Sequence, residues 1–141
     1  MTTKSLMAKK NILLVDDDDI ANFLIEKIVQ STGLAENIYK ALNGREALKF
    51  FSEDKTNYPE VVLLDLNMPI MNGFEFLSAF QMLELKEKEN ILIILVTSSS
   101  NPDDIEKARS LGIRHYLTKP ISADSIKTII LNEFNGPLSI N

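Results

Sequence analysis

The chain alternates short runs of aliphatic residues with stretches of helical apolar spacing, and this alternation restricts its fold more than any other feature. Continuous aliphatic runs occupy residues 12–15, 61–64 and 91–96. Such runs are typical of strands that are buried on both faces of a parallel sheet. Two weaker strands are expected near residues 37–40 and 115–117.

Each expected strand is followed by apolar residues at the spacing of an amphipathic helix. Five β–α pairs predict an α/β fold with an open, doubly wound parallel sheet, because five pairs are too few for an eight-stranded barrel. Gly33 and Gly112 mark two helix ends, and Asn101-Pro102 marks a helix start. The five apolar stripes comprise Ala21, Leu24, Ile25, Ile28 and Val29; Ala47, Leu48 and Phe51; Phe76, Leu77 and Phe80; Ile105, Ala108 and Leu111; and Ile126, Ile129, Ile130 and Phe134.

Length and composition narrow the class of protein. A chain of 141 residues is typical of one domain, and a net charge of −5 disfavours nucleic acid as the partner. The absence of cysteine excludes disulfides, thiolate metal sites and a cysteine nucleophile. No apolar run reaches the roughly 18 residues of a membrane span, and the N-terminus lacks the apolar stretch of a secretory signal. We therefore expect a cytoplasmic protein with no membrane partner.

Polar residues stand at the carboxyl ends of four expected strands. They are the four aspartates at 16–19, then Asp65, Thr97 and Lys119. In an open α/β sheet these ends share one edge, where ligands bind. Taken singly, each has a simpler explanation as a helix cap, a turn residue or a solvated charge. Asp18 and Asp19 in particular are expected to cap and begin the following helix.

Several carboxylates at one edge repel one another unless a cation lies between them. Oxygen ligands without histidine or cysteine favour Mg²⁺. A lysine and a hydroxyl beside an aspartate indicate phosphoryl transfer to the carboxylate. The chain has neither a P-loop nor a dinucleotide motif, so the phosphoryl group is expected to come from another molecule. The single histidine, His115, lies in a short expected strand and is interpreted as a surface or packing residue.

Four segments, in this order, resemble the CheY-like receiver domains of two-component response regulators. They are ILLVDDDD at 12–19, VVLLDLNMPIMNGFEFL at 61–77, IILVTSSS at 93–100 and HYLTKPISA at 115–123. The resemblance spans residues 11–134 and implies a five-stranded parallel sheet in the order 2-1-3-4-5 with five helices. Residues 1–10 and 135–141 would then be tails, which are too short to hold an output domain.

The resemblance implies an acceptor and a set of metal ligands. Asp65 matches the aspartate that is phosphorylated. Asp16 and Asp17 match the acidic pair, in which Asp17 binds Mg²⁺ directly and Asp16 acts largely through a water. The backbone carbonyl of Asn67 would complete the protein ligands of the metal.

The resemblance also implies which residues respond to phosphorylation. Thr97 matches the hydroxyl that moves toward the phosphoryl group, and Lys119 matches the lysine that contacts it. The peptide bond between Lys119 and Pro120 is typically cis in this family. Tyr116 matches the aromatic switch that turns inward. The signal would leave through a surface that includes Lys107, Leu111, Arg114 and Ser125.

The chain departs from the family pattern at a few positions. Asn72 replaces the usual acid before Gly73, away from the expected metal ligands. Ser99 occupies a position whose side chain tunes dephosphorylation, so the lifetime of the phosphoryl group is left open. The connections at 52–60 and 82–90 are slightly longer than usual.

The resemblance implies a single-domain response regulator, and not a turnover enzyme, that a sensor histidine kinase or a histidine phosphotransfer protein phosphorylates. An unknown downstream protein would receive the signal. One alternative is a haloacid-dehalogenase-like phosphatase that uses Asp17 and Asp19, although Asp65 would then have no role. Another is a degenerate receiver that serves only for docking and binds no Mg²⁺.

Overall fold

A computed structural model describes residues 8–52, 58–85, 88–99 and 101–140, with side chains described as far as residue 135. Within these ranges the chain forms five strands, five α-helices and one short 3-10 helix. Most of the expected tail 1–10, the middle of the two long connections and Ser100 lie outside the described residues.

The strands form one parallel sheet in the order β2-β1-β3-β4-β5, as the resemblance implied. A helix precedes each strand after the first, and a short 3-10 helix, η2 (Lys88–Asn90), is added before β4. The strands are β1 (Lys10–Val15), β2 (Ala35–Ala41), β3 (Val61–Leu64), β4 (Leu92–Thr97) and β5 (His115–Thr118).

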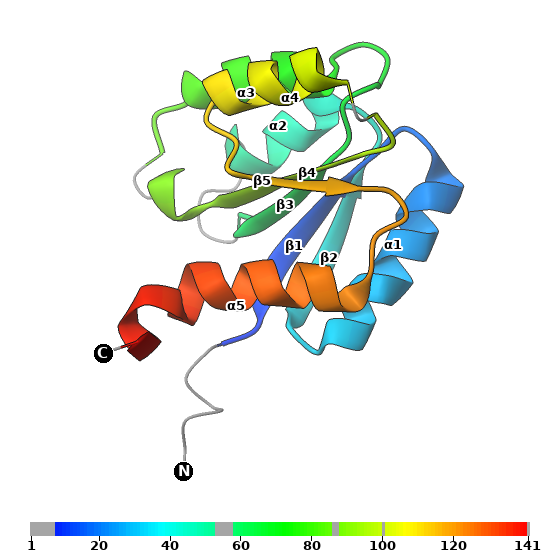
Figure 1. Cartoon of the computed structure of the whole chain (residues 1–141). Helices are drawn as coiled ribbons and strands as arrows, with labels where there is room; N and C mark the ends of the chain where they lie inside the picture. Colours follow the sequence, from blue (N-terminus) through cyan, green and yellow to red (C-terminus); the bar gives the residue numbers. More distant parts are fainter. Residues whose placement is uncertain (1–7, 53–57, 86–87, 100, 141) are drawn as a thin grey trace.

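The helices cover both faces of the sheet. Helices α1 (Asp19–Thr32) and α5 (Ala123–Ile140) pack on one face (Figure 1). Helices α2 (Gly44–Ser52), α3 (Gly73–Gln81) and α4 (Pro102–Ser110) pack on the other (Figure 1). This arrangement is the doubly wound fold that the alternating pattern predicted.

The core is divided in two because successive side chains of a strand point to opposite faces. Leu13 and Val15 of β1 belong to the cluster under α2, α3 and α4, where Phe51 and Phe80 meet edge to face with ring centroids 5.2 Å apart. Ile12 and Leu14 belong to the cluster under α1 and α5. The central strands β1, β3 and β4 are therefore buried on both faces, which explains why they are continuous aliphatic runs.

Helix α1 is rotated relative to the predicted apolar stripe. The prediction that Leu24 faces the core is wrong, because its side chain is 56% exposed. Asn22 is instead buried, at 1% exposure, together with Ile25, Val29 and Thr32. The polar Asn22 is turned inward because its amide nitrogen donates to the carbonyl of Asp16 at the end of β1 (2.9 Å).

Helix α5 continues past Phe134, where the resemblance places the end of the domain, to Ile140. Part of the expected C-terminal tail is thus helical, and the domain boundary itself stays a prediction.

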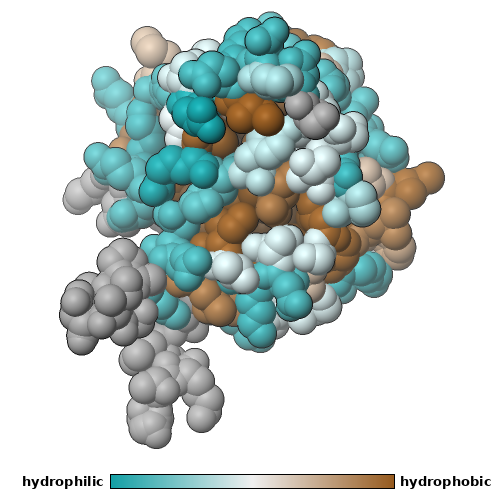
Figure 2. All heavy atoms as spheres, in the orientation of Figure 1, coloured by the Kyte–Doolittle hydropathy of each residue, from teal (hydrophilic) through white to brown (hydrophobic). Residues whose placement is uncertain are grey.

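Helix α1, on its outer side, carries exposed apolar side chains, which protrude at the right of the space-filling view (Figure 2). These residues are Ile20, Phe23 and Leu24.

Candidate functional site

The ends of the two central strands bring aspartates together. Val15 of β1 pairs with Leu64 of β3, so the residues that follow them, Asp16 and Asp65, lie side by side. The backbone N–H of Asp65 donates to the carbonyl of Val15 (3.0 Å). Carboxylate oxygens of Asp16, Asp17 and Asp65 lie within 4.8 Å of one another. The structure thus groups three of the aspartates that the sequence placed at this edge.

Lys119 reaches into this group from the end of β5. Its Nζ donates to Oδ2 of Asp16 at 2.7 Å and lies 3.6 Å from Oδ1 of Asp65. The backbone N–H of Lys119 donates to the carbonyl of Thr97 (2.9 Å), which ties the end of β5 to the end of β4. The Lys119–Pro120 peptide bond is cis, as the resemblance implied. We call Asp16, Asp17, Asp65 and Lys119 the acid cluster.

Burial sets the ionisation of this cluster. Asp65 is 9% exposed, and burial raises its pKa to about 6, against the lowering effect of Lys119 and with a further raising effect from Asp16. Burial by itself would lower the pKa of Lys119, but its hydrogen bond to Asp16 and the charge of Asp65 outweigh burial, so the pKa of Lys119 is raised. The lysine is therefore held as a cation among carboxylates.

The acid cluster fits a divalent cation. Three carboxylates and one ammonium leave an excess of negative charge, and the donors are all oxygens, which Mg²⁺ prefers. Asp17 is exposed, so it can bind an ion that enters from solvent. Asn67 follows Asp65 by two residues and is also exposed, and the role of its carbonyl stays a prediction.

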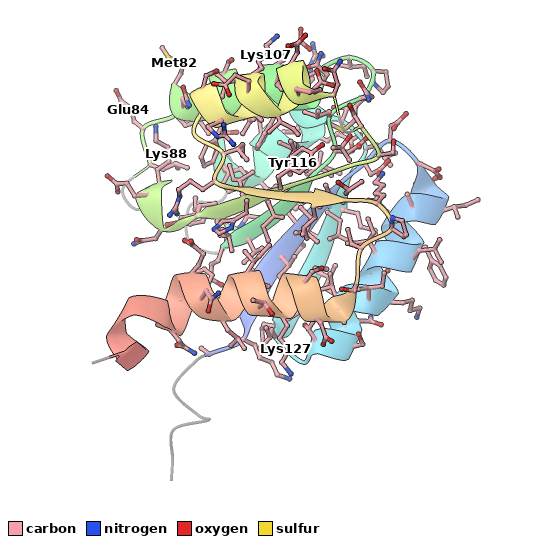
Figure 3. All side chains as sticks on the ribbon, viewed as in Figure 1. Met82, Glu84, Lys88, Lys107, Tyr116 and Lys127 are labelled. Atoms are coloured by element: carbon pink, nitrogen blue, oxygen red, sulfur yellow. The ribbon has the colours of Figure 1, made fainter. Side chains whose placement is uncertain are left out.

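Thr97 lies at the end of β4 and is buried. Its Oγ1 accepts a hydrogen bond from the backbone N–H of Ser99 (3.2 Å). The hydroxyl of Tyr116, which lies between β5 and α4, donates to the carbonyl of Ser99 (Figure 3). Ser99 Oγ donates to Asp104 in the first turn of α4 (3.0 Å). Ser99 therefore connects Thr97, Tyr116 and α4, a link that the sequence did not reveal.

The turn after Asp65 is held by two unusual positions. A Cβ on Gly73 would lie 2.6 Å from the carbonyl oxygen of Asp65, so only glycine fits there. Ile70 has a φ of 66°, a left-handed conformation that is unfavourable for a β-branched residue. Asn72 caps α3 in a capping box with Glu75, which gives this departure from the family pattern a structural role.

The phosphatase alternative is disfavoured by this geometry. Asp19 is an exposed residue in the first turn of α1, and Asp18 caps that helix, as the sequence predicted. The group of close carboxylates contains Asp65 in place of Asp19.

The fold and the strand-end cluster agree with what comparison finds. The response regulator receiver domain family matches residues 12–131. This chain belongs to that family. The receiver domain is a module of two-component phosphorelay signalling.

The receiver domain has relatives of similar length. It is 32% identical to Protein PilH of Pseudomonas aeruginosa, over 84% of this chain and 93% of PilH. It is 29% identical to sporulation initiation phosphotransferase F of Bacillus subtilis, over 88% of this chain and 93% of that protein. The crystal structure of a two-component response regulator from Cytophaga hutchinsonii matches with a TM-score of 0.81 and 30% identity, over 90% of this chain and 98% of that one. Other curated relatives are much longer, and this chain spans only 7% and 32% of two of them.

The residues expected at the output surface of the receiver domain lie on α4, β5 and α5 or next to them. Lys107 and Arg114 are exposed, whereas Leu111 and Ser125 are half-buried. Arg114 and His115 both contact the carboxylate of Glu133 on α5, at 2.9 and 2.8 Å. His115 therefore packs against α5, consistent with its interpretation from sequence.

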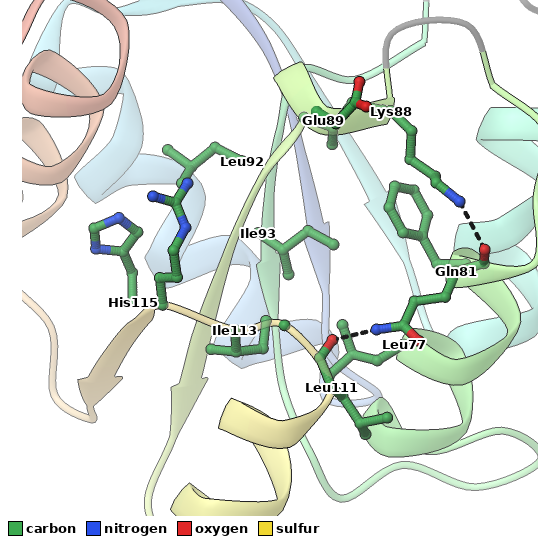
Figure 4. A pocket seen from close by; sticks show the side chains of 13 residues that line it. Leu77, Gln81, Lys88, Glu89, Leu92, Ile93, Leu111, Ile113 and His115 are labelled. Atoms are coloured by element: carbon green, nitrogen blue, oxygen red, sulfur yellow. Dashed lines mark hydrogen bonds between the residues drawn. The ribbon is translucent and has the colours of Figure 1, made fainter.

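A large cavity of the receiver domain, about 430 Å³, lies at the opposite edge of the sheet from the acid cluster. Two polar side chains of its lining are hydrogen-bonded across it: Lys88 Nζ donates to the carbonyl of Gln81, and Gln81 Nε2 donates to the carbonyl of Leu111 (Figure 4). These bonds connect the carboxyl ends of α3 and α4.

Among the described residues, no helix is long and apolar enough to cross a membrane.

Proposed function

We propose that Asp65 accepts a phosphoryl group, with Mg²⁺, from a phosphohistidine of a sensor histidine kinase or a histidine phosphotransfer protein. The observation that carries this proposal is the acid cluster itself, in which a buried aspartate lies between two further aspartates and a lysine. The role of this chain is then to switch a protein contact and not to turn over a substrate.

In the proposed step, a carboxylate oxygen of Asp65 attacks phosphorus. The bond between phosphorus and the imidazole nitrogen of the donor breaks, and the imidazole keeps the electron pair and later takes a proton from solvent. Lys119 is close enough to both carboxylates to turn from Asp16 toward the new phosphoryl oxygens. Mg²⁺, when bound, offsets the charge that is spread over those oxygens.

The donor must approach the edge of the sheet where Asp65 lies. Two exposed apolar features flank this edge: the face of α1 formed by Ile20, Phe23 and Leu24, and Ile70 in the turn after β3. An exposed apolar cluster of this kind usually marks an interaction site. We propose that the phosphodonor docks its own apolar side chains on these residues.

The response to phosphorylation is proposed to pass through Thr97, Ser99 and Tyr116 to α4. Phosphorylation is a local change of charge that biases an element with two arrangements. The bonds of Ser99 to Thr97, Tyr116 and Asp104 supply a connected route for this change. The surface of α4, β5 and α5 would then present Lys107, Leu111, Arg114 and Ser125 to a downstream protein.

The proposal is tested by incubating the protein with acetyl phosphate and Mg²⁺ and measuring its intact mass. We expect one added phosphoryl group in the wild-type protein and none in Asp65→Asn. Asp19→Asn is the matched control, since Asp19 is exposed and lies outside the acid cluster. Steady hydrolysis of a phosphate ester with label on Asp17 would support the phosphatase instead, and failure to bind Mg²⁺ would support a docking module.

A further inference from the structure

Asn22 occupies a core position that an apolar residue would fill at lower cost. It is 1% exposed and begins the inner face of α1, ahead of the buried Ile25 and Val29. Burying an amide is unfavourable unless its donors and its acceptor are all hydrogen-bonded. A buried polar residue beside a charged site is therefore expected to serve that site.

One half of this amide is satisfied and the other is not. Nδ2 donates to the carbonyl of Asp16 (2.9 Å). Oδ1 is the one buried side-chain nitrogen or oxygen of the described residues that has no hydrogen-bond partner. Rotating the amide by half a turn would place two oxygens against each other, so the orientation is fixed by the carbonyl of Asp16.

A small cavity lies where Asn22 meets the acid cluster. Its volume is about 10 Å³, close to the smallest volume that admits one water molecule, about 10 to 15 Å³. The polar residues that line it are Asn22, Asp16, Asp65 and Lys119. The rest of the lining is apolar (Leu14, Val15, Ile25, Leu63 and Val96), so a water here would depend on the unpaired acceptor of Asn22 and on the charged residues beside it.

We propose that this cavity binds one ordered water, which Asn22 holds beneath the acid cluster. The water donates one hydrogen to Oδ1 of Asn22 and the other to a carboxylate of Asp16 or Asp65, and it accepts a hydrogen bond from Lys119. Lys119 has donor capacity left for this bond, because its ammonium has three N–H groups and makes one close bond, to Asp16.

Asn22 is then a positioning residue for phosphoryl transfer, an inference that rests on the proposed function. It fixes Asp16 through the backbone carbonyl, and it fixes the side chains of the cluster through the water. Hydrogen bonds behind metal ligands orient those ligands, and removing such a partner typically lowers metal affinity about 10- to 100-fold.

The water is tested directly by crystal structures of the wild-type protein and of Asn22→Leu, at a resolution that defines single waters. We expect a water within hydrogen-bonding distance of Asn22 Oδ1 and of one member of the acid cluster. In Asn22→Leu two bulkier methyl groups replace the amide oxygen and nitrogen and fill the cavity, so this water is absent. An empty cavity in the wild-type protein overturns the proposal.

The positioning role is tested by calorimetric titration of Mg²⁺ into Asn22→Leu, Asn22→Ala and the control Thr32→Val. Thr32 is a buried polar residue at the other end of the same helix. Its hydroxyl donates to the carbonyl of Val29 (2.6 Å). We expect affinity to fall about 10-fold in Asn22→Leu and to stay unchanged in Thr32→Val.

Asn22→Ala separates positioning from stability. It leaves a larger cavity that water can enter, so it should bind Mg²⁺ more tightly than Asn22→Leu although it unfolds more easily. A purely structural role predicts the reverse order, and an unchanged affinity in Asn22→Leu contradicts positioning. Failure of the proposed function is distinguishable, because the wild-type protein would then bind no Mg²⁺ while the water remained in its crystal structure.

Discussion

The carboxyl group of Asp65 shows how burial and charge act on one residue. Burial disfavours its ionised form, and the charge of Lys119 favours it. Burial prevails, so the group releases its proton only near pH 6 when no metal is bound. A cation between the carboxylates would favour the ionised form, so binding of the proposed metal would activate the proposed acceptor.

The raised pKa of Asp65 predicts a pH-dependent stability in the absence of metal. Because the folded-state pKa, about 6, exceeds the unfolded value of about 4, the folded protein binds more protons between these pH values. The free energy of unfolding should therefore fall as pH rises from 4 to 6. Asp65→Asn removes this loss and should be more stable at pH 7 by about 2 to 3 kcal/mol.

Urea unfolding at several pH values, in the presence of EDTA, measures this difference. Asp19→Asn serves as the control, since its exposed carboxylate lies outside the acid cluster. Equal stability of Asp65→Asn and the wild-type protein at pH 7 would show that the pKa of Asp65 is not raised.

Ile70 combines an unfavourable backbone with an exposed apolar side chain. Its φ is 66° and it is 69% exposed, so neither conformation nor burial explains isoleucine there. Asparagine adopts this conformation more readily, and Ile70→Asn should raise the free energy of unfolding by about 1 kcal/mol. The same variant should accept phosphoryl groups more slowly from a histidine kinase but at the wild-type rate from acetyl phosphate, because only the kinase needs a docking surface.

Thermal unfolding and the two phosphorylation rates check this prediction. Ile20→Asn is the comparison, because Ile20 lies in α1 at a helical position and its replacement should weaken kinase transfer without a gain in stability. If Ile70→Asn slows both donors equally, Ile70 acts on the acceptor and not on docking.

At the scale of elements, helix caps and a bond between two loops fix the carboxyl edge of the sheet. The side chain of Asp18 accepts from two N–H groups at the start of α1, and Asn101 caps α4. The carbonyl of Met71 accepts from the N–H of Gly44, which ties the β3–α3 turn to the start of α2. The acid cluster is thus carried by loops whose geometry is set by caps and glycines.

Asn72 tests how much one cap contributes. Its Oδ1 accepts from the N–H of Glu75 (2.9 Å), and its own N–H donates to the carboxylate of Glu75 (2.8 Å). Asn72→Ala should lower the free energy of unfolding by about 1 kcal/mol, measured by urea unfolding. Glu75→Gln keeps an acceptor and should cost less. Mg²⁺ affinity should stay unchanged in both variants, since neither residue belongs to the acid cluster.

At the scale of the whole molecule, the site is a concentration of negative charge at one edge of an acidic protein. The acid cluster holds three of the aspartates of a chain whose net charge is −5. A ligand that binds only the folded state stabilises it by mass action. Mg²⁺ should therefore raise the melting temperature of the wild-type protein.

The size of this stabilisation depends on how fully Mg²⁺ occupies its site. At a concentration 100 times the dissociation constant, Mg²⁺ should add about 2.7 kcal/mol to the free energy of unfolding. Differential scanning calorimetry with increasing MgCl₂ measures the shift, with KCl at matched ionic strength as the salt control. Asp17→Asn should lose most of the shift, and an equal shift in Asp17→Asn would place the ion elsewhere.

The sequence alone determined the fold class and predicted the edge of the sheet at which the aspartates meet. The spacing of apolar residues in strands and helices is set by neighbouring residues in the chain, and a strand buried on both faces is aliphatic throughout. The strands β1, β3 and β4 could therefore be predicted without tertiary information. The residues that follow those runs had to share one edge because parallel strands end together. The strand order came from the resemblance, and the structure confirms it.

Only the tertiary structure decided the rotation of α1, the pairing of Lys119 with Asp16 and the links made by Ser99. Each depends on contacts between residues far apart in the chain, such as Lys119 with Asp16, which no local period records. Asn22 and Leu24 are the sharpest case. Both fit an amphipathic helix, and the carbonyl of Asp16, which accepts a hydrogen bond from the amide of Asn22, decided which of the two the core would hold.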